Sequence, residues 1–328
     1  MADTLLLTGS DGYVGQRLAK RLGRHVDVIG ISRRGTLGVA CELLDEAALD
    51  DVARTVSPRW IVHAAGNKNI GACEKTPMLA YDANVRTASN VLRAWPDVPM
   101  LYISTDYIFA GTQGHYRESS PVAPGTTYGR SKLCAEVTGA LTAPGRFTSV
   151  RVSAVYDASA PFLTFLDREL REGRPVDCYA NSYYSPTYID DLADAMLALM
   201  RCEARPDVVH VAGERISRFD FARTFANAFG YDPSLVRPVP LDRVNTALYP
   251  DLSLATDVAA DALGFTPTPH ETALGHIARG VPHADARAFS TVLRFQRPDA
   301  RGDERRAVGG DQLPRNRRVL HAWGTLSS

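Results

Sequence analysis

The strongest constraint on the fold of this chain is a glycine-rich turn near its start, set between an apolar run and an amphipathic segment. Residues 4–8 (TLLLT) favour β-structure, residues 9–15 (GSDGYVG) follow at once, and apolar side chains then recur at helical spacing. Gly9 permits a tight turn, Gly12 lets the backbone approach a pyrophosphate, and Gly15 lets the helix pack closely on the strand. A plain glycine-rich turn is the alternative, but the order of strand, turn and helix predicts a dinucleotide-binding site.

The residues after the second expected strand bear on which dinucleotide is bound. That strand covers residues 26–31 and ends in Ser32-Arg33-Arg34-Gly35. In dinucleotide-binding folds an acid at this place holds the ribose hydroxyls of NAD, whereas a basic residue accommodates the extra phosphate of NADP. Two arginines and no acid stand here. NADP(H) is therefore favoured, with NAD(H) as the alternative cofactor, unless the arginines are simply solvated loop residues.

Short apolar strands and helical segments alternate up to about residue 155. This alternation is typical of a parallel, doubly wound sheet, so we predict an α/β fold of the Rossmann type. The expected strands are residues 4–8, 26–31, 39–43, 60–63, 100–103 and 147–152, and the expected helices cover 14–22, 47–55, 77–95 and 128–141.

Tyr128 and Lys132 are spaced for proton transfer. Because they are four residues apart on an expected helix, they lie on one face and one turn apart. An ammonium near a phenol favours the ionised phenol. A tyrosine whose pKa falls by roughly three units from about 10 could exchange protons with a hydroxyl or carbonyl near neutrality. The same spacing also arises by chance on surface helices, so the pair gains its weight from the glycine turn and the strand ends around it.

Beyond Val155 the alternation loosens. A helix over 162–172 and the aromatic-polar run 178–187 (CYANSYYSPT) precede further short helices and one strand at 208–211. We predict a smaller α/β substrate-binding lid on the carboxyl ends of the strands, where ligands bind in such sheets. The predicted domains are residues 1–155 for NADP(H) binding, with 188–212 returning to this domain, and residues 156–187 and 213–284 for substrate binding.

Composition and charge argue against several other classes of protein. Lys plus Arg and Asp plus Glu number 37 each, so nothing global indicates nucleic acid or an anionic membrane. No apolar run reaches the roughly 20 residues that cross a bilayer, and the first residues do not resemble a signal peptide. Five scattered cysteines lack metal-ligand or redox spacing, so we expect a cytoplasmic protein with reduced thiols and no metal site. The charged segment 285–328 is expected to be a disordered tail, with a polyanion-binding arm as the alternative.

Together these motifs resemble those of the extended short-chain dehydrogenase/reductases. STDYIFAG followed by YGRSKLCAE is most similar to the dTDP-4-dehydrorhamnose reductase group, and the resemblance covers roughly residues 3–280. The supporting segments are TGSDGYVG (8–15), HAAG (63–66), STDYIFAG (104–111), YGRSKLCAE (128–136), YYSPTYIDDLADAM (183–196) and LSLATDVAADALGF (252–265).

The resemblance implies an NADP(H)-dependent ketoreductase acting on a nucleotide-activated deoxysugar, typically at C4 of a dTDP-4-keto-6-deoxyhexose. Tyr128 would be the general acid, Lys132 would lower its pKa and hold the nicotinamide ribose, and Thr105 would polarise the substrate carbonyl. Asn84 matches a helix asparagine that helps to order the active site in many members. The residues expected at the cofactor are Gly9, Asp11, Gly12, Tyr13, Val14, Gly15, Ser32, Arg33, Arg34, Asp45, Ala64, Ala65, Gly66, Asn84, Tyr128 and Lys132, and those expected at the substrate are Thr105, Asp106, Asn181 and Tyr184.

One loop departs from the group, and other functions remain open. Residues 66–70 (GNKNI) replace the stretch expected after HAA in rhamnose-pathway enzymes, which leaves the sugar undetermined. Arg168, Arg171 or Arg237 could pair the substrate's diphosphate. We expect a nucleotide-sugar substrate and no nucleic-acid or membrane partner, with a homodimer as an alternative to a monomer.

Two other functions compete with the reductase. An epimerase or dehydratase of the same superfamily usually favours NAD, against which Arg33 and Arg34 argue, and the dehydratase acids of the TTDxxE type are absent. The contrasting class is a non-catalytic nucleotide-binding regulatory subunit, similar to that of methionine adenosyltransferase. Turnover of NADPH with a keto-sugar nucleotide distinguishes the two classes.

Overall fold

Seven parallel strands form the centre of the computed structural model, which describes residues 4–242 and 248–280. The strand order is β11-β6-β5-β4-β1-β2-β3, and it confirms the predicted α/β fold of the Rossmann type. The tail expected over 285–328 lies outside the described residues. The bounds are β1 Thr4–Thr8, β2 Asp27–Ser32, β3 Gly38–Ala40, β4 Trp60–His63, β5 Met100–Thr105, β6 Phe147–Val152 and β11 Val208–His210.

Helices cover both faces of the sheet because its strands are apolar on both sides. On β1, Leu5 and Leu7 pack into one core with α1 and α8, whereas Leu6 packs into a second core with α2, α5 and α6. None of the helices in the described part of the chain is long and apolar enough to cross a membrane. The bounds are α1 Tyr13–Leu22, α8 Ile189–Arg201, α2 Glu46–Thr55, α5 Thr87–Ala94 and α6 Thr127–Thr142.

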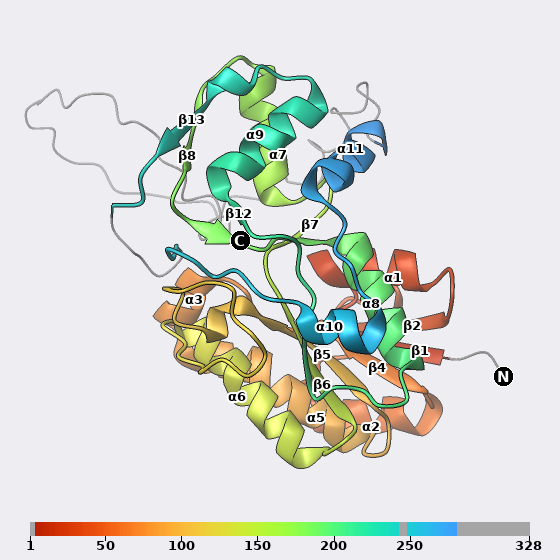
Figure 1. The fold of residues 1–328 in the computed structure, drawn as a ribbon. Coiled ribbons are helices and arrows are strands. Elements are labelled where there is room, and N and C mark those ends of the chain that lie inside the picture. The colour runs from red at the N-terminus through yellow and green to blue at the C-terminus, as the bar shows by residue number, and fades with distance from the viewer. Residues whose placement is uncertain (1–3, 243–247, 281–328) are drawn as a thin grey trace, which may run out of the picture.

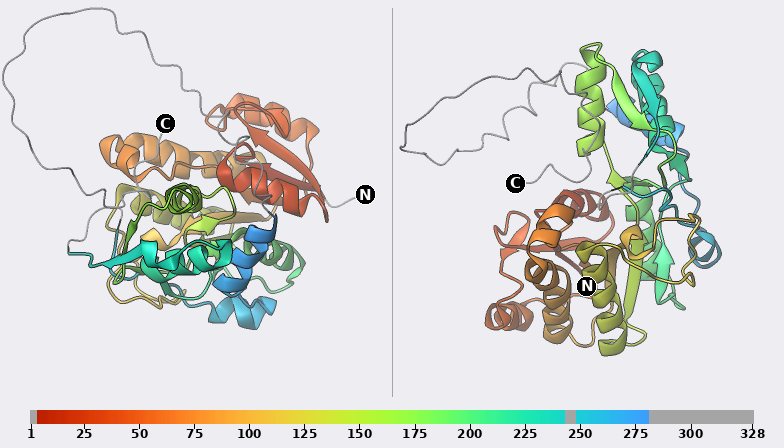
Figure 2. Two further views of the ribbon diagram at one scale, coloured as in Figure 1. Left: turned by 90° about the horizontal axis from the view of Figure 1, so that it is seen from above. Right: turned by 90° about the vertical axis from the view of Figure 1, so that its left-hand side faces the viewer.

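A smaller lobe, drawn above the sheet in Figure 1 and seen from two other sides in Figure 2, is built from two separate stretches of chain. In it, α9 packs against α7, α11, β8 and β13. The segment between the stretches returns to the sheet, where α8 packs on α1 and β11 pairs with β6. The lobe contains α7 Pro161–Arg171, α9 Arg218–Phe229, α11 His270–Gly280, the 3-10 helix η3 Pro233–Leu235, and the pairs β8 Val176–Tyr179 with β13 Val236–Val239 and β9 Tyr183–Tyr184 with β12 Ile216–Ser217.

Short connecting elements join the lobe to the sheet. A parallel pair of two-residue strands, β7 and β10, follows β6 and precedes α8, and α10 packs on α8 and β11. The bounds are β7 Val155–Tyr156, β10 Thr187–Tyr188 and α10 Asp257–Leu263. Strands of two residues are too short to produce a periodic pattern, which explains why the sequence did not predict them.

The prediction of one regular helix over 77–95 is wrong in its middle. The structure has α4 Pro77–Tyr81, then a π-helical turn η1 Asp82–Arg86, then α5. A π-turn inserts one extra residue per turn and is frequent at functional sites, and here it contains Asn84. The helix α3 Ile70–Lys75, which precedes α4, was not predicted at all.

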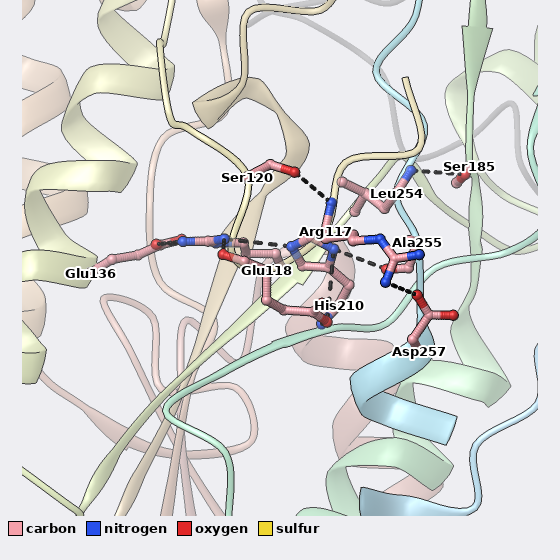
Figure 3. A network of polar contacts seen from close by, with 10 residues as sticks. Arg117, Glu118, Ser120, Glu136, Ser185, His210, Leu254, Ala255 and Asp257 are labelled. Atoms are coloured by element: carbon pink, nitrogen blue, oxygen red, sulfur yellow. Dashed lines mark hydrogen bonds and ion pairs between the residues drawn. The ribbon is translucent and has the colours of Figure 1, made fainter. Parts of the chain in front are cut away.

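A buried ion pair links the sheet to the loop that precedes α6. Arg151 of β6 and Glu136 of α6 are 2.8 Å apart, and both side chains are buried. Arg151 also donates to the backbone oxygen of Glu118, whose carboxylate accepts the backbone N–H of His210 at 2.8 Å. His210 Nδ1 lies 3.0 Å from the carbonyl oxygen of Ala255, and desolvation lowers its pKa to about 3, so the imidazole is neutral. Figure 3 shows this network joining segments that are far apart in sequence.

Replacing Arg151 by alanine is expected to lower the free energy of unfolding by about 3–5 kcal/mol, because Glu136 would be left as an unpaired buried charge. Urea unfolding followed by circular dichroism measures the change. The double variant Arg151→Met with Glu136→Leu should recover most of the loss. Arg171→Ala, which breaks an exposed pair with Asp167, should cost less than about 0.5 kcal/mol. If Arg151→Ala and Arg171→Ala lowered the free energy of unfolding by the same amount, the stabilising role of the buried Arg151–Glu136 pair would be contradicted.

Candidate active site

The glycine turn forms a cradle at the start of α1 that fits a dinucleotide pyrophosphate. Gly9 has φ +67°, and a Cβ there would come within 2.6 Å of Ala65 Cα at the end of β4. A Cβ on Gly15 would lie 2.2 Å from the carbonyl oxygen of Gly9, so only glycine lets α1 pack this closely on the turn. The first turn of α1, which follows Gly12, has no acidic residue and no side-chain cap. Its free N–H groups and positive dipole end therefore suit an anion.

The two arginines after β2 are exposed, and an acid lies beside one of them. Arg34 Nε donates to Asp11 Oδ2 at 3.2 Å, and Thr36 donates to the same oxygen at 3.1 Å. Hydrogen bonding from Ser32, and then from Thr36 and Arg34, holds the pKa of Asp11 below its ordinary value. The acid comes from the glycine turn rather than from β2, so the local sequence around Arg33 and Arg34 gave no sign of it.

Two of the residues expected at the cofactor have structural roles. Asp45 is exposed and caps α2 by accepting the backbone N–H of Ala48 at 3.0 Å. Val14, in the first turn of α1, is half-buried against the core on that face of the sheet. A contact of either residue with adenine or ribose stays a prediction.

The predicted catalytic residues Tyr128 and Thr105 meet at the carboxyl ends of neighbouring strands. Thr105 ends β5 and Tyr128 lies in the first turn of α6, close enough for the Thr105 hydroxyl to lower the pKa of the phenol. Thr105 Oγ1 also donates to Asp106 Oδ1 at 3.0 Å, and Ser153, just after β6, donates to Asp106 Oδ2 at 2.6 Å. Thr105, Asp106 and Ser153 therefore form one hydrogen-bonded chain, and Tyr128 of α6 lies beside it. The contribution of Ser153 was not foreseen from the sequence.

The expected depression of the Tyr128 pKa is not seen. Desolvation raises the pKa of Tyr128 above its ordinary value, although hydrogen bonding to Thr105 opposes this shift. Lys132 Nζ donates to the backbone oxygen of Ile103 at 2.6 Å and lies 3.9 Å from the ring centroid of Tyr102. Its ammonium is thus held beneath the strand end, and burial lowers the pKa of Lys132 to about 7. The phenol is protonated near neutrality and is ready to donate a proton.

Asp106 is a buried carboxyl beside the catalytic pair. Desolvation raises its pKa to about 6, against hydrogen bonds from Ser153 and Thr105 and the positive charge of Arg218 at the start of α9. No cluster of three or more His, Cys, Asp or Glu side chains that could hold a metal occurs among residues 4–242 and 248–280. We therefore consider Asp106 as a hydrogen-bonding group rather than a metal ligand.

Asn84 in the π-turn ties the loop after β4 to the catalytic helix. Its Oδ1 accepts the backbone N–H of Asn67 at 2.7 Å, and its Nδ2 donates to the backbone oxygen of Asn67 at 3.1 Å and to Ser131 Oγ at 2.9 Å. Ser131 in turn donates to the backbone oxygen of Tyr128 at 2.8 Å. One buried amide therefore fixes both the loop that begins at Gly66 and the first turns of α6.

Glu74 of α3 also holds the start of the catalytic helix. Its two carboxylate oxygens accept the backbone N–H and the hydroxyl of Thr127 at 2.6 and 2.8 Å. Thr127 immediately precedes Tyr128. Because α3 has only six residues, no periodic pattern in the sequence marked Glu74 as part of the site.

The residues expected at the substrate in the small lobe are not gathered at one place. Tyr184 is buried against Phe221, with the guanidinium of Arg218 at 4.6 Å from its ring centroid. Asn181 is exposed, and its side-chain oxygen accepts the backbone N–H of Leu241 at 2.6 Å. Contact of either residue with a substrate stays a prediction.

The arginines suggested for a diphosphate have other partners or lie at the surface. Arg168 pairs with Glu169 at 2.8 Å, Arg171 pairs with Asp167 at 2.7 Å, and Arg237 is exposed on β13. All three are on the small lobe, two on α7 and one on β13. Arg218, which is buried and influences Asp106, was not singled out from the sequence.

The parallel sheet, the glycine cradle and the Thr105, Tyr128 and Lys132 set define an extended short-chain dehydrogenase/reductase. The family model described as RmlD substrate binding domain matches residues 3–281, and the chain belongs to this family. The family model and the curated relatives described next confirm the predicted relation to the dTDP-4-dehydrorhamnose reductase group. They also confirm the predicted class of enzyme, an oxidoreductase.

Individual relatives agree with this placement. The chain is 29% identical to a dTDP-4-dehydrorhamnose reductase of Mycolicibacterium smegmatis, over 81% of this chain and 82% of that protein. It is 28% identical to methionine adenosyltransferase 2 subunit beta of Xenopus laevis, over 71% of this chain and 74% of that protein. The crystal structure of a Bacillus anthracis dTDP-4-dehydrorhamnose reductase in complex with NADP is 24% identical, has a TM-score of 0.76, and is matched over 86% of this chain and 99% of that one.

The pKa of Asp106 predicts a pH dependence of stability. Its folded pKa of about 6 lies above the unfolded value of about 3.9, so the unfolded state loses its proton first as the pH rises. Asp106 should therefore not change the free energy of unfolding below about pH 4, and should lower it by about 2–3 kcal/mol above about pH 6. Asp106→Asn should remove this loss, as measured by urea unfolding at a series of pH values.

Ser153→Ala provides a matched control for the Asp106 experiment. It removes a hydrogen bond that lowers the pKa of Asp106, so the pH range of the stability loss should move upward. If the wild type and Asp106→Asn lose stability in parallel between about pH 4 and pH 7, the raised pKa of Asp106 is refuted.

Proposed function

We propose that the protein reduces a keto group of a nucleotide-activated deoxysugar with NADPH, at C4 of a dTDP-4-keto-6-deoxyhexose. The observation that carries this proposal is the placement of the protonated phenol of Tyr128, in the first turn of α6, beside the hydroxyl of Thr105 at the end of β5. The Tyr128 side chain keeps some exposed surface, so a substrate carbonyl can reach it. Curated relatives with this activity in their names support the substrate class.

The chain's own residues supply the acid and the hydrogen-bond donor for such a reduction. Bound NADPH provides the hydride, and the carbonyl oxygen gains negative charge as the carbon is reduced. Tyr128 gives its proton to that oxygen, and the Thr105 hydroxyl stabilises the developing charge. Lys132 lies one helical turn from Tyr128 with its ammonium held by the Ile103 carbonyl, and its protonated form would favour the phenolate left after proton transfer.

The cofactor is assigned to the cradle at the start of α1. Gly9, Gly12 and Gly15 leave room for the pyrophosphate against the helix N-terminus, and the exposed Arg33 and Arg34 lie where a 2′-phosphate is accommodated in such folds. The NADP held by the Bacillus anthracis relative agrees with this choice. NAD(H) remains the alternative.

We also propose that cofactor and substrate are bound by different parts of the chain, as predicted from the sequence. The sheet with its helices binds the cofactor, and the residues predicted from the sequence as the substrate-binding domain, 156–187 and 213–284, bind the sugar nucleotide. Arg218 supports this division, because a buried cation of α9 in that lobe lowers the pKa of Asp106 at the end of β5. A substrate between the two parts would contact both.

A non-catalytic role is the second candidate, favoured by one observation. The methionine adenosyltransferase subunit beta of Xenopus laevis is as similar in sequence as the reductases. A regulatory subunit would bind NADP(H) without oxidising it in the presence of a keto-sugar nucleotide. The turnover experiment below therefore distinguishes the two candidates.

Tyr128→Phe should lower kcat for NADPH oxidation with a dTDP-4-keto-6-deoxyhexose by roughly 10²–10⁴-fold, because the only change is loss of the proton donor. The Kd for NADPH, measured by fluorescence titration, should stay within about twofold of wild type. Tyr231→Phe, which removes a hydroxyl bonded to Asp167 in the small lobe, serves as the matched control. An unchanged kcat in Tyr128→Phe would refute its role as the acid.

The variant with Arg33→Ala and Arg34→Ala should weaken NADPH binding by about tenfold or more and NADH binding by less than about twofold, since only NADPH carries the extra phosphate. Isothermal titration with NADPH and with NADH gives the change in Kd of each nucleotide between wild type and variant. Arg24→Ala, which removes an exposed arginine just after α1, is the control. Equal losses for NADPH and NADH would show that the two arginines do not read the phosphate.

A further inference from the structure

Two cations share the ring of a tyrosine beside the glycine turn. Arg17 Cζ lies 3.9 Å from the ring centroid of Tyr13, and Lys68 Nζ lies 5.0 Å from it. Tyr13 is the first residue of α1, and Lys68 belongs to the loop 66–70 that departs from the rhamnose-pathway pattern. Like charges so close together repel unless a negative group lies between or beside them.

Within the described part of the chain, a carboxylate neutralises one of the two cations and not the other. Arg17 pairs with Asp157 at 2.6 Å, and the other oxygen of that carboxylate accepts hydrogen bonds from Tyr13 and Ser159. Lys68 forms no ion pair with a carboxylate anywhere in residues 4–242 and 248–280. Lys68 keeps exposed surface, but desolvation, followed by the positive charge of Arg17, lowers its pKa. The local electrostatics therefore favour an added anion.

The backbone around Lys68 is fixed on both sides. Asn67 is held by the amide of Asn84, and the backbone N–H of Asn69 donates to Asn67 Oδ1 at 2.9 Å. Asn69 also caps α3 by accepting the backbone N–H of Ala72. The position from which Lys68 projects is thus set by the fold, and its flexible side chain alone has freedom to turn toward a ligand.

The same loop lies next to the cradle for phosphates. The end of β4 at Ala65 touches Gly9, and Lys68 follows three residues later. The first turn of α1 carries no acid to compete for a cation. A diphosphate resting on the N-terminus of α1 would therefore lie beside Tyr13, which is where the ammonium of Lys68 is found.

We propose that Lys68 is a diphosphate-binding residue, whose ammonium pairs with a nucleotide diphosphate held at the glycine turn. The inference rests on the proposed function for the identity of the nucleotide. Two sources share this chemistry, namely the pyrophosphate of NADP(H) and the diphosphate of the sugar nucleotide. Lys68 would thus be a diphosphate contact supplied by the loop 66–70, the loop that departs from the rhamnose-pathway pattern.

Direct binding measurements test the proposal without turnover. Lys68→Gln should weaken NADPH binding about fivefold at low ionic strength if the pyrophosphate is the partner, and should weaken dTDP binding by a similar factor if the substrate is the partner. Lys68→Arg, which keeps the charge, should bind both within about twofold of wild type. The difference between wild type and Lys68→Gln should shrink at high salt, because an exposed charge pair is screened.

Two controls make the outcome decisive. Adenosine 2′-monophosphate carries no diphosphate, so its affinity should be the same in wild type and Lys68→Gln. Lys20→Gln, at the far end of α1, should change none of these affinities. Unchanged affinity of Lys68→Gln for both NADPH and dTDP would overturn the proposal. If the wild type binds NADPH but reduces no keto-sugar nucleotide, the proposed function fails while the titrations still decide the role of Lys68.

Discussion

The packing of Gly9 against the end of β4 is the contact on which the rest of the site depends. Any larger residue at Gly9 would collide with the backbone of Ala64 and Ala65. Because this contact is so close, the start of α1 and the loop after β4 face the same space above the sheet. The carboxyl ends of β5 and β6 border that space, since all these strands are parallel. Cofactor and catalytic groups therefore converge without any long loop having to carry them there.

Hydrogen bonds of side-chain amides and carboxylates then set the distances within this space. Asn84 connects the loop at Asn67 to Ser131 of α6, and Glu74 holds Thr127 at the start of the same helix. Each of these contacts satisfies polar groups that are at least partly buried, so losing one partner would leave the other without a hydrogen bond. The tyrosine next to Thr127 is thus positioned by neighbours that never touch the reacting atoms.

Much of this arrangement could be read from the sequence, for identifiable physical reasons. Apolar strands with glycine or small polar residues at their ends predict a parallel sheet with its ligands at one edge, and Thr105 and Tyr128 were found together as expected. The state of the phenol could not be predicted, because it depends on how deeply Tyr128 is desolvated and on the carbonyl of Ile103 that draws Lys132 away. Asp11 was expected at the cofactor, but its contact with Arg34 could not be predicted, because the residues around Arg34 do not show that the glycine turn folds against them.

The small lobe is made from two stretches of chain that are separated by α8 and β11, and this order has a consequence for synthesis. While a nascent chain ends before Val208, the β6 edge of the sheet has no neighbour, although its strand is fully buried in the finished protein. An open, apolar edge strand readily pairs with another chain. A fragment that stops after residue 155 would expose this edge permanently. The sheet is therefore completed on this side only by β11, well beyond the end of the nucleotide-binding motifs.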